Sequence, residues 1–307
     1  MEVLLEPYIY EGGAYKHGLI IELLEDLGGY LVQKIPSGSE IMLILLIPKD
    51  DIQHIEKLAK KMLGTLVKSQ LTGVEVAVIS PTLASHHLPH SSCDIAEHLR
   101  RDGANTNMIG LARGMGRNVS LSLDYERKLI NEHDIALFTL GNFSDCIINK
   151  KPKLFNGIKI PIVVTGFPII SVEDISGATV YVENLGRTSH RLRKKNELSA
   201  LDNMNKKVSL LVEKMREDLS RDPLTILPAR VMNEIQNQIP EINDAFTPSS
   251  VTLQLDGLRV KLPYDEYHER VGNIEFDEGF ILSDKAEISR SKMKNYILVK
   301  MFRESNM

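Results

Sequence analysis

The chain has 307 residues, of which 43% are hydrophobic and 25% charged, and its formal net charge is −4. This composition is typical of folded globular proteins, and it excludes wholesale disorder, collagen and a disulfide-rich scaffold. At about 150 residues per domain, the length indicates roughly two domains. A net negative charge removes the general attraction to a phosphate backbone, so we do not expect nucleic acid as a partner.

Neither a secretory signal nor a membrane span is expected. The opening sequence MEVLLEPYIYEGG has no basic stretch ahead of an apolar one and no small-residue cleavage site. The longest apolar run, Ile41 to Ile47, is far shorter than the roughly 20 residues that cross a bilayer. The two cysteines, Cys93 and Cys146, indicate a reducing compartment. We therefore expect a cytoplasmic protein with no membrane partner.

Residues 1–71 predict a small α+β domain of the ferredoxin-like type, read as a βαββα unit. The first helix carries Leu19, Leu23 and Leu27 at four-residue spacing, and Gly28 follows it. Two strands separated by the turn sequence PSGS come next, and then a second helix that opens with two aspartates. The first helix is expected at 15–27, the two strands at 30–35 and 40–47, and the second helix at 50–64.

Residues 72–185 predict a doubly wound α/β domain. Short, strongly apolar strands alternate with helices, which is typical of a parallel sheet covered on both faces. We expect strands at 74–80, 106–112, 134–140, 159–165 and 178–183. We expect helices at 93–102 and 123–132, and a shorter one near 145–150.

The remainder divides into a basic and helical region, 186–240, and a β-rich segment, 241–307. The run Gly186–Lys195 contains five cations and no acid, and is either a solvated face or a docking patch for an acidic partner. Helices are expected at 197–222 and 229–239. The strings VTLQLDGLRVKLP and NYILVKMF alternate apolar and polar residues, which predicts β-hairpins.

The unusual residues follow the predicted strands of the central domain. His87, His90 and Cys93 come after the first of these strands, the loop ARGMGRN after the second, and Cys146 after the third. Ligands of open α/β sheets bind beyond the carboxyl ends of the strands, where loops and helix amino termini converge. We therefore expect these residues to share one edge of the sheet.

Four of these residues are candidate metal ligands: Cys93, Cys146, His90 and, after them, His87. A serine cap would place Cys93 in the first turn of its helix, where the helix dipole favours a thiolate. His90 lies three residues earlier, so both side chains can turn towards one metal. Two cysteines and a histidine do not complete a four-thiolate cluster, so an iron–sulfur site here would need ligands from another chain.

Two alternatives to an iron–sulfur site remain open for the thiols, a zinc site and a structural role in the core. Zinc is the alternative metal, although Cys93 and Cys146 lie 53 positions apart and lack paired CxxC spacing. Either thiol can instead fill a small apolar gap in the core, and Ile147 and Ile148 make this more plausible for Cys146.

The glycine-arginine loop is a candidate anion or cofactor site through Arg113, Gly114, Gly116 and Arg117. Backbone N–H groups and guanidinium groups together suit an anion. The loop matches neither a P-loop nor a full dinucleotide fingerprint, so ATP hydrolysis by this chain is not expected. The absence of GxSxG and HExxH argues against common hydrolase mechanisms.

The sequence resembles the methanogenesis marker protein 7 family. The resemblance is carried by SPTLASHHLPHSSCDIAEHLRRDGANTNMIGLARGMG, by LFTLGNFSDCI and KPKLFNGIKIPIVVTGFP, and more weakly by EGGAYKHGLIIELLEDLGGYLVQK and ENLGRTSHRLRK. It covers most of the first 240 residues. The middle domain is also similar, more distantly, to the C protein of the methyl-coenzyme M reductase operon.

The resemblance implies a methanogenic archaeal source and a role in the complex that activates methyl-coenzyme M reductase. In that process an ATP-binding component supplies energy, and complex iron–sulfur clusters deliver low-potential electrons to the nickel tetrapyrrole. The implied partners are other methanogenesis marker proteins, the operon's C protein, the ATP-binding component and the reductase itself.

Three classes of function follow from these observations. The first is a non-enzymatic subunit that holds a complex iron–sulfur cluster at an interface between subunits and helps to relay electrons. The second is a stand-alone redox enzyme with Cys93 as nucleophile and Cys146 as resolving thiol. The third is a structural adaptor without a cluster.

Overall fold

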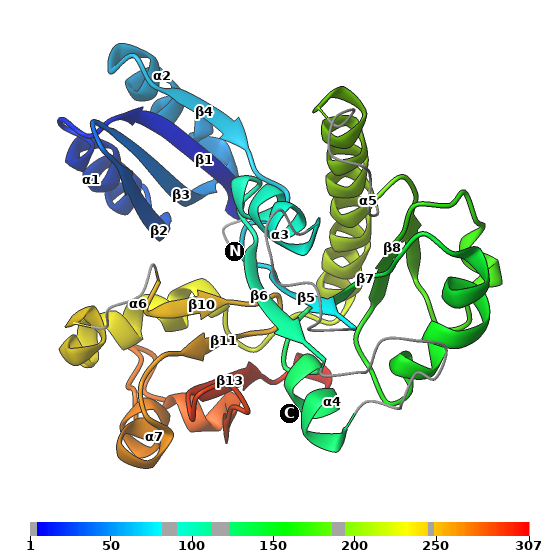
Figure 1. Ribbon diagram of the computed structural model, residues 1–307. Coiled ribbons are helices and arrows are strands. Elements are labelled where there is room, and N and C mark those ends of the chain that lie inside the picture. Colours follow the sequence, from blue (N-terminus) through cyan, green and yellow to red (C-terminus); the bar gives the residue numbers. More distant parts are fainter. Residues whose placement is uncertain (1–4, 82–90, 112–122, 186–193, 245–248, 307) are drawn as a thin grey trace. The chain divides into compact units, whose positions relative to one another are not determined.

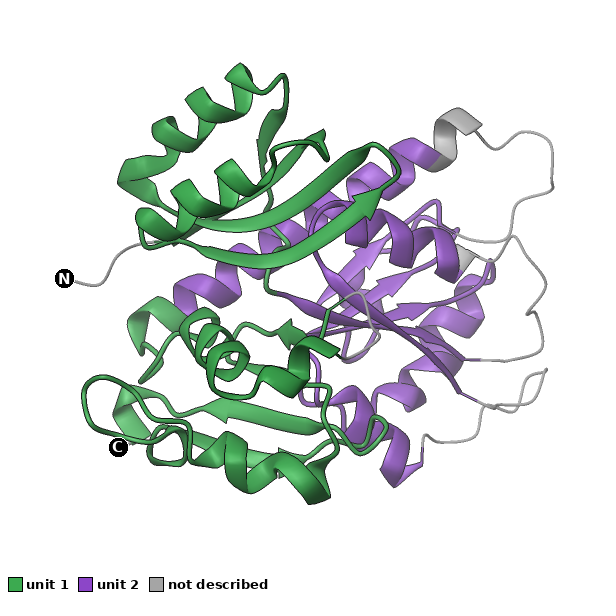
Figure 2. Ribbon diagram, turned by 90° about the vertical axis from the view of Figure 1, so that its left-hand side faces the viewer, with its two compact units in different colours: residues 1–73, 219–307 green, residues 74–218 purple. Residues whose placement is uncertain are grey.

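The computed structural model describes residues 5–81, 91–111, 123–185, 194–244 and 249–306. The chain divides into two compact units, of which unit 1 comprises residues 1–73 and 219–307 and unit 2 comprises residues 74–218 (Figure 2). Unit 2 is therefore an insertion in the sequence of unit 1. In the described part of the chain, no helix has the length and apolar character needed to cross a membrane.

The amino-terminal part of unit 1 is a four-stranded antiparallel sheet with the order β2-β3-β1-β4. Each neighbouring pair is antiparallel, and β1 and β2 are separated by β3, as in a ferredoxin-like βαββαβ unit. The elements are β1 (Leu5–Gly13), α1 (Gly18–Asp26), β2 (Tyr30–Ser37), β3 (Glu40–Pro48), α2 (Ile52–Lys61) and β4 (Thr65–Lys68).

Apolar spacing explains how the two helices cover this sheet. Ile20 and Leu24 of α1 and Ile55 and Ala59 of α2 are buried, and both pairs are four residues apart on one helical face. They pack in one cluster with apolar side chains of β1 and β3. The other face of the sheet contributes Ile9, Val32 and Ile44 to a second cluster, which it shares with the carboxy-terminal elements.

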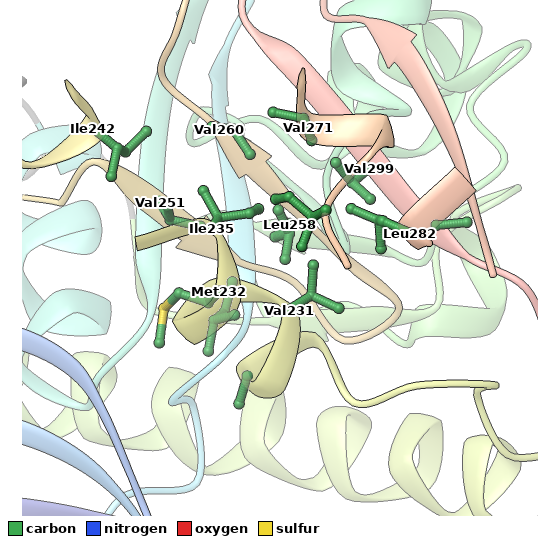
Figure 3. Close-up of a cluster of buried hydrophobic side chains, with 14 of the residues drawn as sticks. Val231, Met232, Ile235, Ile242, Val251, Leu258, Val260, Val271, Leu282 and Val299 are labelled. Atoms are coloured by element: carbon green, nitrogen blue, oxygen red, sulfur yellow. The ribbon is translucent and has the colours of Figure 1, made fainter. Parts of the chain in front are cut away.

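The carboxy-terminal part of unit 1 is a four-stranded antiparallel sheet with the order β10-β11-β13-β12, packed on helix α6. Figure 3 shows Val231, Met232 and Ile235 of α6 against Leu258 and Val260 of β11. The elements are α6 (Pro228–Gln238), β10 (Val251–Leu253), β11 (Gly257–Val260), α7 (Tyr264–Gly272), β12 (Ala286–Arg290) and β13 (Ile297–Met301).

Unit 2 is built on a five-stranded parallel sheet with the order β6-β5-β7-β8-β9. The strands are β5 (Glu75–Ser80), β6 (Asn105–Gly110), β7 (Ile135–Thr139), β8 (Ile162–Thr165) and β9 (Val180–Val182). All residues of β7 and β8 are buried, as expected for parallel strands with both faces covered.

Helical segments cover the two faces of this sheet. They are α3 (Ser91–Arg101), α4 (Asp124–Ile130), a π-helix (Cys146–Lys150), a 3-10 helix (Lys151–Phe155) and the long helix α5 (Lys194–Arg221), shown in Figure 1. On α5, Asn205 donates a hydrogen bond to Asp102, which follows α3, and Lys207 donates one to the carbonyl of Tyr181 in β9.

The strand order creates a topological switch point between β5 and β7. From β5 the chain proceeds to β6 on one side, and it then crosses to β7 on the other. The connections that follow β5 and β7 therefore lead away in opposite directions. In open α/β sheets, ligands bind outside the carboxyl ends of the two strands at such a point.

The predicted fold class is confirmed: an α/β chain with a ferredoxin-like amino-terminal sheet, a central parallel sheet and carboxy-terminal hairpins. Two elements were not expected from the sequence. Strand β4 has only four residues, three of them exposed, and α7 buries only Val271 and Gly272. Neither segment has a strong apolar period, so neither was visible in the sequence pattern.

Candidate functional site

Cys93 is the third residue of α3, the helix that follows β5. Its side chain is half-buried and forms no disulfide. Ile95 and Ala96, two and three positions further along the helix, are buried in the core. The predicted placement of this thiol in the first turn of a helix is confirmed. Its partial exposure leaves the thiol accessible.

Two hydroxyl groups hold the first turn of α3 at the ends of the strands. The oxygens of Ser92 and Thr139 lie 2.9 Å apart, and the Thr139 hydroxyl donates to the carbonyl of Ile79 in β5 at 3.2 Å. Ser92 lies inside the helix, where its hydroxyl contacts a strand residue. The contact fixes the residue next to Cys93 beside the carboxyl ends of β5 and β7.

Cys146 begins the π-helix that follows β7, and its sulfur is also free and half-buried. Its backbone N–H donates to the carbonyl of Phe143 at 3.1 Å. The neighbouring Ile147 is fully buried in the cluster that covers one face of the sheet. Single π-helical turns are rare and are frequent at functional sites.

A glycine at the end of β8 makes room for this turn. A Cβ atom on Gly166 would lie 2.7 Å from Cδ1 of Ile147 and 2.9 Å from the hydroxyl oxygen of Tyr181. Both distances are too short for real side chains, so the close approach of Ile147 requires glycine at this position. Ile147 thereby positions Cys146 against β8.

A half-buried lysine lies near the Cys146 sulfur. Burial lowers the pKa of the Lys151 ammonium group, and the adjacent Cys146 acts in the opposite direction by raising it. Its neighbour Lys150 forms an ion pair with Asp145 at 2.9 Å. The sequence analysis did not single out Lys151, because one lysine in a lysine-rich stretch gives no spacing signal.

A buried hydroxyl lies beside the same edge. Thr165, the last residue of β8, is 0% exposed, and its hydroxyl oxygen has no hydrogen-bond partner among the described residues. Thr165 is paired in register with Thr139, so both side chains are on the face of the sheet that Ser92 contacts. An unpaired buried hydroxyl costs about 1–3 kcal/mol, which favours a function for this group.

Large apolar side chains are exposed around Cys146. Phe143 is 75% exposed, Phe167 42% and Ile169 88%, and they lie on the two loops that follow β7 and β8. The N–H of Phe167 donates to the carbonyl of Gly141 at 3.4 Å, which holds the two loops together. Exposed apolar side chains grouped in this way are typical of surfaces that another molecule covers.

The two free thiols therefore follow the two strands that flank the topological switch point. Comparison with known proteins places this arrangement in a family: residues 5–274 match the family model of methyl-coenzyme M reductase operon protein C. The chain belongs to that family. The matched range includes the strands and helices of unit 2 and both cysteines.

Two other comparisons concern individual proteins. An uncharacterized protein of Methanocaldococcus jannaschii is 44% identical over 299 residues, which covers 97% of this chain and 94% of the relative. Among solved structures, glutamyl-tRNA reductase from Methanopyrus kandleri is 9% identical and aligns over 78% of this chain and 86% of its own, with a TM-score of 0.24. A TM-score this low carries no argument about fold or function.

Several predicted site residues lie outside the described residues. They are His87 and His90, which follow β5 in the sequence, and Arg113, Gly114, Gly116 and Arg117, which follow β6. Residues 186–193 of the basic run, which follow β9, also lie outside them. Within the described ranges, no group of three or more His, Cys, Asp or Glu side chains could hold a metal ion.

The described residues thus include two free thiols, Cys93 and Cys146, and no complete metal site. Their chemistry fits an iron–sulfur cluster, because thiolates are its usual ligands, but two thiolates are fewer than the four that such clusters take. The alternative in which either thiol fills a core gap fits less well, since both are half-buried. His98 of α3 lies with Nε2 3.1 Å from Oδ1 of Asp202 in α5.

Proposed function

We propose that this chain is a non-enzymatic subunit of the ATP-dependent complex that activates methyl-coenzyme M reductase. The family match supports the link to the reductase operon. The comparisons do not name methanogenesis marker protein 7; the motifs around Cys93 and Cys146 resemble that family, and we propose it as the finer assignment. We place the protein in the cytoplasm, with the reductase and the other activation subunits as its partners.

The observation that carries the proposal is the position of the two thiols. Cys93 and Cys146 follow the two strands that flank the switch point, are half-buried, and form no disulfide. In this role both would bind a complex iron–sulfur cluster as thiolates. When bound, such a cluster supplies one-electron transfer at low potential to the nickel tetrapyrrole.

The surrounding residues supply what such a cluster needs from the protein. The Lys151 ammonium group offsets negative charge at the Cys146 sulfur, and the Ser92–Thr139 contact orients the turn that carries Cys93. Phe143, Phe167 and Ile169 offer an apolar surface that a partner subunit can cover. Covering this edge would exclude water, and the partner would provide the ligands that this chain lacks.

Paired cysteine variants test whether the thiols are ligands. Cys93→Ala and Cys146→Ala should each abolish cluster occupancy in the anaerobically purified complex while the subunit stays folded. Neither thiol is fully buried, so neither change should leave a large core cavity. The control is Ser144→Ala, an exposed position two residues before Cys146. If both cysteine variants keep full iron content and reductase activation, the thiols are not ligands.

A second candidate function is a thiol redox enzyme that cycles Cys93 and Cys146 between thiols and a disulfide. The lysine beside Cys146 favours this alternative, because a nearby cation increases the reactivity of a sulfur. It predicts that mild oxidation of the isolated chain joins the two thiols, which mass spectrometry of the digested protein would detect. The ligand role predicts instead that both thiols of the isolated chain remain separately alkylatable after such treatment.

A further inference from the structure

Three large apolar side chains on the loops that follow β7 and β8 form what we call the loop surface of unit 2. Phe143 is 75% exposed, Phe167 42% and Ile169 88%. The first of them lies beside the thiol-bearing turn, since the carbonyl of Phe143 accepts a hydrogen bond from the N–H of Cys146 at 3.1 Å. The loop surface therefore adjoins the Cys146 end of the candidate site.

Hydrogen bonds hold the loop surface in place. The N–H of Phe167 donates to the carbonyl of Gly141 at 3.4 Å, and the carbonyl of Phe167 accepts from the N–H of Asn184 at 3.3 Å. The hydroxyl of Tyr181 donates to the carbonyl of Pro168 at 2.6 Å. A surface that is already ordered loses little conformational entropy on binding, so its exposed apolar area can contribute to affinity.

Lysines follow the loop surface on the turn after Cys146. The segment 141–155 contains Lys150, Lys151 and Lys153, and its one acid is Asp145. Lys150 forms an ion pair with Asp145 at 2.9 Å, whereas Lys151 and Lys153 form no ion pair with any described residue. The chain as a whole has a net charge of −4, so this segment is a local reversal of sign.

The apolar side chains and the lysines together restrict what can bind. Protein interfaces have a centre in which aromatic side chains are enriched and lysine is depleted, and a polar rim. Two phenylalanines and an isoleucine followed by lysines match that arrangement, and the lysines are complementary to carboxylates on the partner. Recognition of an anionic membrane commonly uses clusters of about four to eight cations, which is more than this segment carries.

We propose, on the basis of the proposed function, that the loop surface docks an acidic partner subunit, whose apolar side chains cover Phe143, Phe167 and Ile169 and whose carboxylates face Lys151 and Lys153. The Cys146 sulfur is half-buried beside the loop surface, so the docked subunit also covers this thiol. Contacts with the apolar side chains slow dissociation, and the lysines at the rim increase the association rate.

Zero-length crosslinking of the purified activation complex tests the charge of the partner. A water-soluble carbodiimide joins a lysine to a carboxylate where the two groups are in contact, and mass spectrometry identifies the joined residues. We expect crosslinks from Lys151 or Lys153 to Asp or Glu residues of another subunit. The control is Lys206, an exposed lysine on α5 of the same unit, which should not join to that subunit.

Matched substitutions test the apolar and the charged part of the surface separately. Ile169→Ser should lower recovery of the crosslinked subunit with the tagged chain about tenfold at any salt concentration, because it removes an apolar contact. Lys153→Glu should lower recovery more at low salt than at high salt, because salt screens charges at a rim. The controls Leu210→Ser and Lys206→Glu make the same chemical changes at exposed positions of α5, and should change recovery little.

The iron content of the same preparations separates this proposal from the proposed function. A wild-type complex that shows the crosslinks but contains no iron would contradict the proposed function and support the docking surface. The docking proposal is wrong if neither lysine joins a carboxylate of another subunit, or if the variants at Ile169 and Lys153 behave like the controls on α5. It is also wrong if the wild-type chain alone binds phosphatidylserine vesicles and Lys153→Glu abolishes that binding.

Discussion

Replacing Gly166 by alanine adds one methyl group where β8 meets the turn that carries Cys146. The new Cβ atom would lie 2.7 Å from Cδ1 of Ile147 and 2.9 Å from the hydroxyl oxygen of Tyr181. Ile147 is fully buried, and the Tyr181 hydroxyl donates to the carbonyl of Pro168 at 2.6 Å. Neither neighbour can therefore move away without losing a contact.

Extra methyl groups in a packed core cost about 1–3 kcal/mol of unfolding free energy. For a domain of this size, each kcal/mol lowers the Tm by about 4 °C. We therefore expect Gly166→Ala to lower the Tm of thermal unfolding by about 4–12 °C. Displacement of Ile147 also moves Cys146, so the variant should recover less iron in the purified complex than the wild type.

Two further variants make this test specific. A Cβ atom on Gly141, in the preceding loop, would meet nothing within 4 Å, so Gly141→Ala is the matched control and should change the Tm little. Ile147→Val removes the Cδ1 methyl group that Gly166→Ala would strike. The double variant should therefore be less destabilised than the sum of the two single ones. Equal stability of Gly166→Ala and Gly141→Ala would refute the proposed packing of Ile147 on Gly166.

Three other predictions address the same unit. Burial raises the pKa of Tyr181 to about 12, so the free energy of unfolding should fall as pH rises from about 10 to 12. Tyr181→Phe should remove this fall from the plot of unfolding free energy, measured by urea denaturation, against pH. Thr139→Val should cost about 1–3 kcal/mol in the same assay, because it removes two buried hydrogen bonds, to the Ser92 hydroxyl and to the Ile79 carbonyl, each worth about 0.5–1.5 kcal/mol; an unchanged midpoint would contradict these contacts. Alanine at the three arginines of the run 186–195 should weaken recovery of the complex in a pull-down at physiological salt without changing the fold, and unchanged recovery would identify the run as a solvated face.

The sequence predicted the elements that position the thiols. The strands of unit 2 are short runs of buried apolar residues separated by polar segments, and this pattern determines both their number and the edge to which Cys93 and Cys146 belong. The same reasoning placed Cys93 in the first turn of α3. These features depend on local apolar patterns and on connectivity, which a single sequence contains.

Other features of the site depend on contacts between distant residues. The Ser92–Thr139 bond, the proximity of Lys151 to Cys146 and the unpaired Thr165 hydroxyl arise from strand order and register. The segment after Cys146 was expected to form an ordinary short helix. It is instead a π-helix followed by a 3-10 helix. Pro152 in this segment cannot donate a backbone hydrogen bond, which disfavours a regular α-helix.

The iron and acid-labile sulfide content of the anaerobically purified activation complex, compared with that of the isolated chain, tests the central proposal most directly. The described residues include two free cysteines and no complete metal site. We therefore predict iron and sulfide in the complex that contains this subunit, and none bound stably to the isolated chain. A complex that contains the chain and activates the reductase but has no iron would contradict the proposed role.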